Sequence, residues 1–132
     1  MTYSHIRILL VDDSNTTRKI LRKTLTEMGV LFVDEAADGL QAWAMLEAGA
    51  ASYGMVFCDW HMPGLDGLQL LEKIREHESM RALPFVMTTA ERKRTEVERA
   101  VLAGATWYIV KPFEAEAIRN VLAKAVLAAA AS

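Results

Sequence analysis

The feature that most constrains the fold of this chain is a fivefold alternation of short apolar runs with segments of helical spacing. The apolar runs are Ile6–Val11, Leu31–Asp34, Met55–Cys58, Pro84–Met87 and Thr106–Val110. Runs this short, bounded by polar or turn residues, are typical of buried strands. The segments between them repeat apolar residues every three or four positions, as Leu21, Leu25 and Met28 do. Alternation of this kind predicts an α/β fold, with one parallel sheet and helices on both faces.

Length and charge narrow the class of protein. The chain has 132 residues, so we expect one domain over residues 1–132, with residues 126–132 as a frayed helix end. A net charge of −2 offers no general basic field for nucleic acid. No apolar run is long enough to cross a bilayer, and the first residues lack the features of a signal peptide. We therefore expect a cytoplasmic protein that binds neither nucleic acid nor membrane.

Three acidic residues and one lysine stand at the ends of predicted strands. Asp12 and Asp13 follow the first apolar run. Asp59 follows the third run, and Lys111 follows the fifth. The carboxyl ends of parallel strands meet at one edge of a sheet, where open α/β sheets bind ligands. We therefore expect all four side chains to lie in one site.

Grouped carboxylates favour a hard divalent cation. Several acids in one place repel each other, and Mg²⁺ relieves that repulsion with oxygen ligands in octahedral geometry. Taken alone, Asp13 or Ser14 could instead cap a helix. Lys111 could either neutralise the acids or extend along the surface. We favour the neutralising role, because a charged Asp59 at the end of a buried run is costly unless it is paired or metal-bound.

Four motifs resemble the receiver domain of two-component response regulators. They are IRILLVDDS, DWHMPGLDG, VMTTAE and YIVKPF, in that order and over nearly the whole chain. The chain is most similar to single-domain regulators of the chemotaxis CheY type. The resemblance, and not the spacing, implies a flavodoxin-like three-layer sandwich whose five-stranded parallel sheet has the order 2-1-3-4-5.

The resemblance also implies the roles of the acidic residues. Asp59 matches the phosphoacceptor of the family. Asp12 and Asp13 match the acidic pair that binds Mg²⁺ together with Asp59. The backbone carbonyl of His61 is the further metal ligand that the resemblance implies. Lys111 matches the lysine of the family motif, which acts with the phosphoacceptor.

Four more positions match residues that switch or modulate receivers. Thr89 matches the switch hydroxyl, because the run Thr-Ala-Glu that it begins fits the family, and Thr88 is the alternative. Tyr108 matches the switch aromatic residue. The side chains of His61 and Glu91 stand at positions that tune how long the phosphoryl group survives, although His61 could equally be a solvated loop residue.

Two features beside the motifs have open interpretations. The first helical segment has a basic side made of Arg18, Lys19, Arg22 and Lys23. This side is either a solvated face or a docking surface for the kinase's phosphohistidine domain. Trp107 precedes Tyr108 and points to the other side of an alternating strand. It either faces a partner or packs on a neighbouring helix.

The expected function is that of a signalling switch and not of an enzyme that turns over a substrate. The phosphoryl donor would be a phosphohistidine on a sensor histidine kinase or a phosphotransfer protein, with Mg²⁺ as the cofactor. The fourth helix, fifth strand and fifth helix would form the surface that controls a protein partner. The flagellar motor switch of chemotaxis is the leading partner, and control of a kinase or a developmental relay is the alternative. We expect a monomer.

Three other functions compete with this one. A flavin- or nucleotide-binding module of similar fold needs a Gly- or Ser/Thr-rich phosphate loop, where this chain has Asp12 and Asp13. A phosphatase of the haloacid dehalogenase type needs a second acid two residues after its nucleophile, where this chain has His61. A degenerate receiver that serves only as an interaction domain would have lost site residues, and here all of them are present.

Overall fold

The computed structural model describes residues 3–90 and 93–131, and within them the chain forms five strands and five α-helices. The strands are β1 (Arg7–Val11), β2 (Phe32–Ala36), β3 (Met55–Asp59), β4 (Phe85–Thr89) and β5 (Trp107–Val110). The helices are α1 (Asn15–Glu27), α2 (Gly39–Gly49), α3 (Gly67–Glu76), α4 (Arg94–Ala103) and α5 (Ala115–Ala131). A 3₁₀ turn, η1 (Ala50–Ser52), connects α2 to β3.

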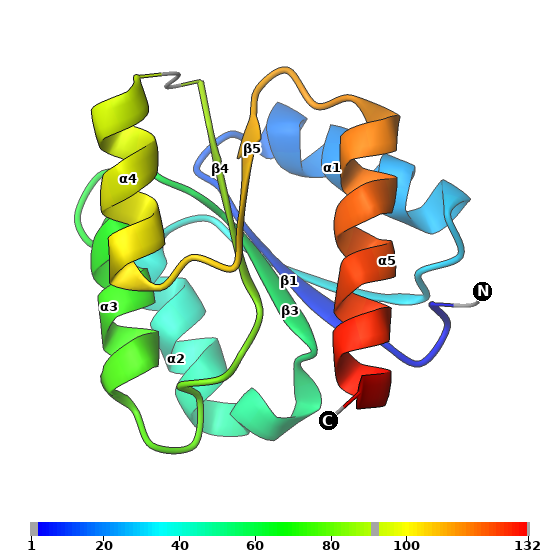
Figure 1. Cartoon of the computed structure of the whole chain (residues 1–132), viewed down its shortest axis with the longest axis horizontal. Helices are drawn as coiled ribbons and strands as arrows, with labels where there is room; N and C mark the ends of the chain where they lie inside the picture. Colours follow the sequence, from blue (N-terminus) through cyan, green and yellow to red (C-terminus); the bar gives the residue numbers. More distant parts are fainter. Residues whose placement is uncertain (1–2, 91–92, 132) are drawn as a thin grey trace.

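The predicted parallel sheet is confirmed, with the strand order β2-β1-β3-β4-β5. Figure 1 shows α1 and α5 on one face of the sheet and α2, α3 and α4 on the other. The three-layer sandwich that the resemblance implied is therefore the fold of this chain. The loops that leave β1 and β5 lie in the upper part of Figure 1, at the carboxyl edge of the sheet.

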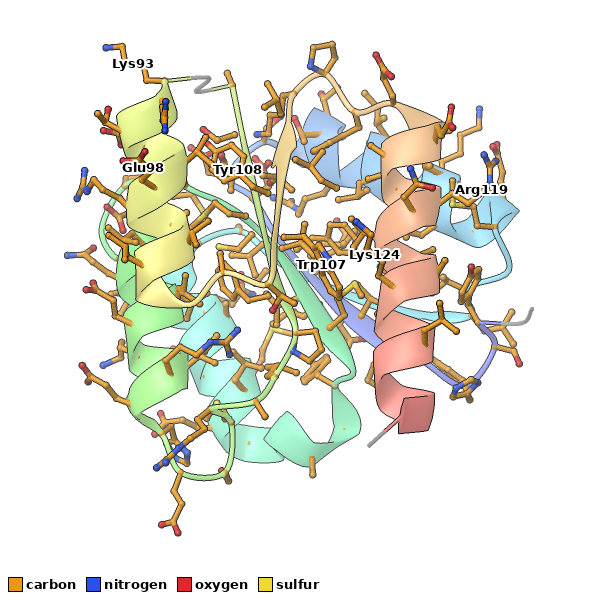
Figure 2. The ribbon with its side chains drawn as sticks, viewed as in Figure 1. Lys93, Glu98, Trp107, Tyr108, Arg119 and Lys124 are labelled. Atoms are coloured by element: carbon orange, nitrogen blue, oxygen red, sulfur yellow. The ribbon has the colours of Figure 1, made fainter. Side chains whose placement is uncertain are left out.

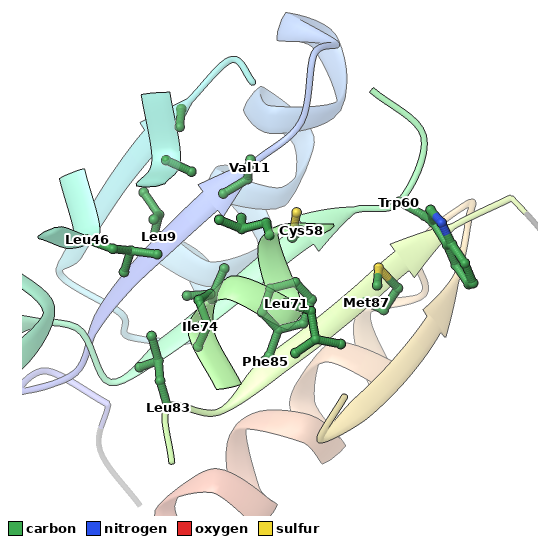
Figure 3. Packing of buried hydrophobic residues seen from close by; sticks show 14 of the residues in the cluster. Leu9, Val11, Leu46, Cys58, Trp60, Leu71, Ile74, Leu83, Phe85 and Met87 are labelled. Atoms are coloured by element: carbon green, nitrogen blue, oxygen red, sulfur yellow. The ribbon is translucent and has the colours of Figure 1, made fainter. Parts of the chain in front are cut away.

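Each face of the sheet packs its own apolar cluster, because alternate residues of a strand point to opposite faces. Leu9 and Met87 are buried on the face covered by α2, α3 and α4. Leu10 and Phe57 are buried on the face covered by α1 and α5. Figure 3 shows the first cluster, with Trp60 at its far end beyond the last residue of β3. The same alternation decides which side each site residue faces.

Three strands run further than the apolar runs of the sequence. β2 ends at Ala36, β3 at Asp59 and β4 at Thr89, whereas the apolar runs end at Asp34, Cys58 and Met87. Asp59 is in register with Thr88. The expected ends were wrong because a polar side chain does not interrupt backbone pairing between strands. The candidate site is therefore built partly from residues inside the sheet.

The helices that follow β1 and β3 begin at side-chain caps. Ser14 caps α1, because its hydroxyl accepts a hydrogen bond from the backbone N–H of Thr17 at 3.2 Å. This settles the choice between Asp13 and Ser14 and leaves the Asp13 carboxylate for the acidic site. Asp66 caps α3 in a reciprocal capping box with Gln69.

Helix α5 carries the alanine-rich end of the chain. It continues to Ala131, so residues 126–131 are helical, and the expectation that this end frays stays a prediction. Within the described residues, no helix has the length and apolar content that crossing a membrane requires.

Candidate metal and phosphoacceptor site

Three carboxylates come together at the carboxyl edge of the sheet. Asp12 and Asp13 follow β1, and Asp59 ends the neighbouring strand β3. One carboxylate oxygen of each residue lies within 4.8 Å of the other two. Asp12 and Asp59 are buried, whereas Asp13 is exposed. Two carboxylates of the cluster are therefore buried, and the third, that of Asp13, is open to solvent.

Lys111 connects two of these carboxylates. Its Nζ lies 2.8 Å from Oδ2 of Asp12 and 3.4 Å from Oδ2 of Asp59. Burial disfavours the ammonium, but the hydrogen bond to Asp12 and the charge of Asp59 outweigh burial and raise the pKa of Lys111. Lys111 is therefore a charged counter-ion inside the site and not an extended surface side chain.

The charge of the cluster fits a divalent cation. Burial raises the pKa of Asp59, and the charge of Lys111, which acts against burial, does not reverse that direction. Three carboxylates against one ammonium leave two net negative charges at one place. A hard cation with two positive charges and a preference for oxygen ligands satisfies both the charge and the donor set, and Mg²⁺ has these properties.

Comparison with known proteins agrees with this geometry. The sequence model of the response regulator receiver domain matches residues 8–123. The chain belongs to the response regulator receiver domain family. It is 42% identical over 120 residues to the chemotaxis protein CheY-3 of Vibrio cholerae, and the match covers 91% of both chains. It is 39% identical over 119 residues to the chemotaxis protein CheY of Pseudomonas aeruginosa, covering 90% of this chain and 94% of that one.

Solved structures of other receivers share this architecture. The chemotaxis protein CheY4 of Vibrio cholerae matches with a TM-score of 0.82 and 28% identity, covering 91% of this chain and 98% of that one. A probable two-component system response regulator/GGDEF domain protein matches with a TM-score of 0.86 and 30% identity. That match covers 96% of this receiver and 51% of the longer protein. The receiver fold therefore occurs both in small chains and as part of larger regulators.

The two threonines at the end of this receiver's β4 are buried and face opposite sides. Thr88 is in register with Asp59, and strand alternation places both on the α1–α5 side. Alternation places Thr89 on the other side of the sheet, where Tyr108 packs (Figure 2). Trp107 is partly buried and packs against the α1–α5 cluster, as the packing interpretation expects, and contact with a partner stays a prediction. Thr88 thus shares a side with the acids, and Thr89 shares a side with the aromatic residue.

The residues that follow Asp59 differ in burial. Trp60 is 2% exposed and its ring stacks on His61, with the ring centroids 5.7 Å apart. His61 itself is exposed. Glu91, the other expected modulator, lies outside the described residues.

Two of the four basic residues on α1 form ion pairs with Glu35. Arg18 Nε lies 2.9 Å from Oε1 of Glu35, and Arg22 Nε lies 2.6 Å from Oε2. Burial raises the pKa of Glu35, but the two arginines outweigh burial and lower it. Lys19 and Lys23 stay exposed. The sequence gave no signal for this pairing, because Glu35 lies on β2 and only the register of the sheet brings it to α1.

Proposed function

We propose that this receiver accepts a phosphoryl group on Asp59 and uses it as a signalling switch. The observation that carries the proposal is the position of Lys111, whose ammonium lies between the carboxylates of Asp12 and Asp59 in a cluster of three acids. A buried carboxylate beside a fixed cation, with further acids to hold a metal, suits phosphoryl transfer to an oxygen nucleophile.

The transfer moves a phosphoryl group from nitrogen to oxygen. An oxygen of Asp59 attacks the phosphorus of a phosphohistidine while the P–N bond breaks and its electron pair stays on the imidazole. Lys111 neutralises charge on the phosphoryl oxygens, and Asp12 and Asp13 would hold Mg²⁺ with the carbonyl of His61. When bound, Mg²⁺ supplies further charge neutralisation at those oxygens. Water later attacks the phosphorus, releases inorganic phosphate and restores the carboxylate.

A small phosphoryl donor tests this chemistry without a kinase. We expect phosphoramidate and MgCl₂ to add one phosphoryl group to the protein, measured by intact mass spectrometry, and a chelator to prevent the addition. Asp59→Asn should remain unmodified. Asp38→Asn is the matched control, because Asp38 caps α2 through the N–H of Gln41 and asparagine caps equally well. Modification of Asp59→Asn at the rate of the wild type would remove Asp59 from the mechanism.

We propose that Thr89 is the switch hydroxyl, because it shares a side of the sheet with Tyr108. Thr89→Ala should then keep phosphorylation and lose the accompanying change at Tyr108. Thr88→Ala should keep both. The change at Tyr108 can be followed by NMR of ¹³C-labelled tyrosine, with Tyr108→Phe to assign the signal. If Thr88→Ala lost the change at Tyr108 and Thr89→Ala kept it, the switch hydroxyl would be that of Thr88.

The phosphohistidine protein is proposed to dock beside Lys111. A hollow of about 440 Å³ there is lined by Thr17, Ile20, Ala90, Lys111, Pro112 and Phe113. Ile20 is 54% exposed, although it is a large apolar residue. Ile20→Glu should slow transfer from a cognate histidine kinase and leave modification by phosphoramidate unchanged. Leu40→Glu, at a leucine on α2 that is 65% exposed, should change neither rate, and equal slowing by both variants would contradict this docking site.

The output surface is proposed to be formed by α4, β5 and α5, which Figure 2 displays with Glu98, Tyr108 and Arg119. Val101 is 59% exposed on α4, so this surface offers apolar area to a protein partner. Because similar proteins are named chemotaxis proteins, a flagellar motor switch component is the leading partner, and a kinase or developmental relay is the alternative. Tighter binding of phosphorylated than unphosphorylated protein to the purified switch component of the same organism would support the first.

A further inference from the structure

The guanidinium of Arg18 ties together three parts of the chain next to the acidic cluster. Its Nη1 donates to the backbone carbonyl of Asp12. Its Nε donates to Oε1 of Glu35 at 2.9 Å, and its Nη2 to Oδ1 of Asn15 at 3.2 Å. The Arg18 side chain is 14% exposed, and its contacts with Asp12 and Glu35 are partly buried, whereas the contact with Asn15 is exposed. Arg18 therefore links the end of β1, the first turn of α1 and β2.

The carbonyl that Arg18 holds belongs to the peptide group between Asp12 and Asp13. The Asp12 carboxylate has its own anchors, because Oδ1 accepts from the N–H of Ser14 and Oδ2 from Lys111, both at 2.8 Å. The Asp13 side chain is exposed, so its direction depends on the orientation of the backbone that carries it. Rotation of the Asp12–Asp13 peptide plane would swing the Asp13 carboxylate relative to Asp59.

We infer that Arg18 is a positioning residue for the divalent cation, acting through the Asp12–Asp13 peptide. The inference rests on the proposed function, because it assumes that the three acids hold the ion. Glu35 is the anchor that fixes the guanidinium from the opposite side. Replacing a residue that orients metal ligands in this way typically changes metal affinity by about tenfold to a hundredfold.

Arg22 provides a matched control within the same cluster. It binds the other oxygen of Glu35 at 2.6 Å and donates through Nη2 to the carbonyl of Val33 at 2.8 Å. Arg22 thus shares the acid partner of Arg18 and lies one turn further along α1. The structure gives it no bond to Asp12 among the described residues. Arg18→Met and Arg22→Met each remove one positive charge and one arm of the Glu35 pair. Arg18→Met also removes the bonds to Asp12 and Asn15, whereas Arg22→Met also removes the bond to the carbonyl of Val33.

The direction in which the Kd for Mg²⁺ changes distinguishes a positioning role of Arg18 from a purely electrostatic one. Removing a cation near a Mg²⁺ site strengthens Mg²⁺ binding if electrostatic repulsion is the only role of that cation. Loss of positioning weakens binding, because Asp13 is no longer aimed at the ion. We expect Arg18→Met to raise the Kd for Mg²⁺ by about tenfold and Arg22→Met to leave it unchanged or lower. Titration with MgCl₂ in a calorimeter measures both, with no phosphoryl donor present.

Arg18→Lys is a second variant that tests the inference even if Arg18→Met does not fold. The lysine keeps the charge, but one ammonium cannot replace a guanidinium that reaches Glu35 and the Asp12 carbonyl at once. It should show an intermediate loss of Mg²⁺ affinity with a cooperative thermal transition. Equal Kd values for wild type, Arg18→Lys and Arg18→Met, or tighter binding by Arg18→Met, would overturn the inference. Absence of Mg²⁺ binding by the wild type would instead overturn the proposed function.

Discussion

The guanidinium of Arg99 on α4 lies 5.6 Å from the centre of the Trp60 indole ring. Trp60 directly follows Asp59, and its backbone is fixed by a bond from its N–H to the carbonyl of Thr88 at 3.1 Å. Arg99 also pairs with Glu96 one turn earlier on α4 at 3.4 Å. Helix α4 therefore contacts the residue next to the phosphoacceptor candidate through a cation–π interaction.

Loss of this contact should change the environment of Trp60 with little loss of stability. Arg99→Ala is expected to shift the Trp60 emission and to lower the free energy of unfolding by about 0.5–1 kcal/mol, the size of an exposed cation–π contact. Emission is measured in a background with Trp43→Phe and Trp107→Phe. Arg94→Ala is the control, because Arg94 pairs on the surface with Glu98 and has no aromatic contact among those found in the described part of the chain. Equal spectra for Arg99→Ala and its parent would contradict the contact.

Asp59→Asn should stabilise the fold at neutral pH when no metal is present. Burial, the largest cause, raises the pKa of Asp59 in the folded protein. A raised pKa means that this group contributes most to stability below its unfolded pKa and loses that contribution as the pH rises through the folded pKa. The ionised wild type thus carries a penalty that asparagine lacks. We expect a gain on the order of 1 kcal/mol at pH 7.

Urea unfolding at several pH values tests the direction of the pKa shift of Asp59. The difference between Asp59→Asn and wild type should shrink as the pH falls towards 4, because the wild-type carboxyl then takes up its proton. Lys111 keeps its shorter bond to Asp12 in the variant, so the ammonium is not left without a partner. A stability difference that grows on acidification would show that the direction of the pKa shift is wrong.

Gly67→Ala should destabilise the protein and slow phosphorylation. A Cβ at this position would lie 2.3 Å from the carbonyl oxygen of Asp59 and 2.8 Å from Cα of Trp60, so the start of α3 must move away from β3. Overpacking of this kind costs about 1–3 kcal/mol. Gly49→Ala is the control, because its nearest atom is the Ser52 hydroxyl oxygen at 3.6 Å. Unfolding free energies that are equal in the two variants would contradict the close approach.

Arg75→Met should be among the more destabilising substitutions outside the site. The Arg75 guanidinium donates to the carbonyls of Leu83 at 2.7 Å, Gly104 at 2.9 Å and Arg81 at 3.1 Å. Removing it leaves carbonyls without their donor, at a cost of about 2–3 kcal/mol. Arg81→Met removes an exposed side chain and keeps the carbonyl, so it should change stability by less than about 0.5 kcal/mol. Denaturant unfolding measures both, and similar values would contradict the prediction.

The sequence determined the succession of strands and helices and the gathering of Asp12, Asp13, Asp59 and Lys111 at one edge of the sheet. These follow from hydrophobic periodicity and from the ends of apolar runs, which are local properties of the chain. The order of the strands came from resemblance to a family and not from spacing. The lengths of β2, β3 and β4 were underestimated, because backbone pairing continues through polar residues such as Glu35 and Thr88.

Only the tertiary structure decided which charged and polar groups meet. Glu35 binds Arg18 and Arg22, and leaves Lys19 and Lys23 as the exposed half of the basic side. Thr88 and Thr89 face different sides of the sheet. The physical reason is that these outcomes depend on register between segments distant in sequence, and a shift of one residue turns each side chain to the opposite face.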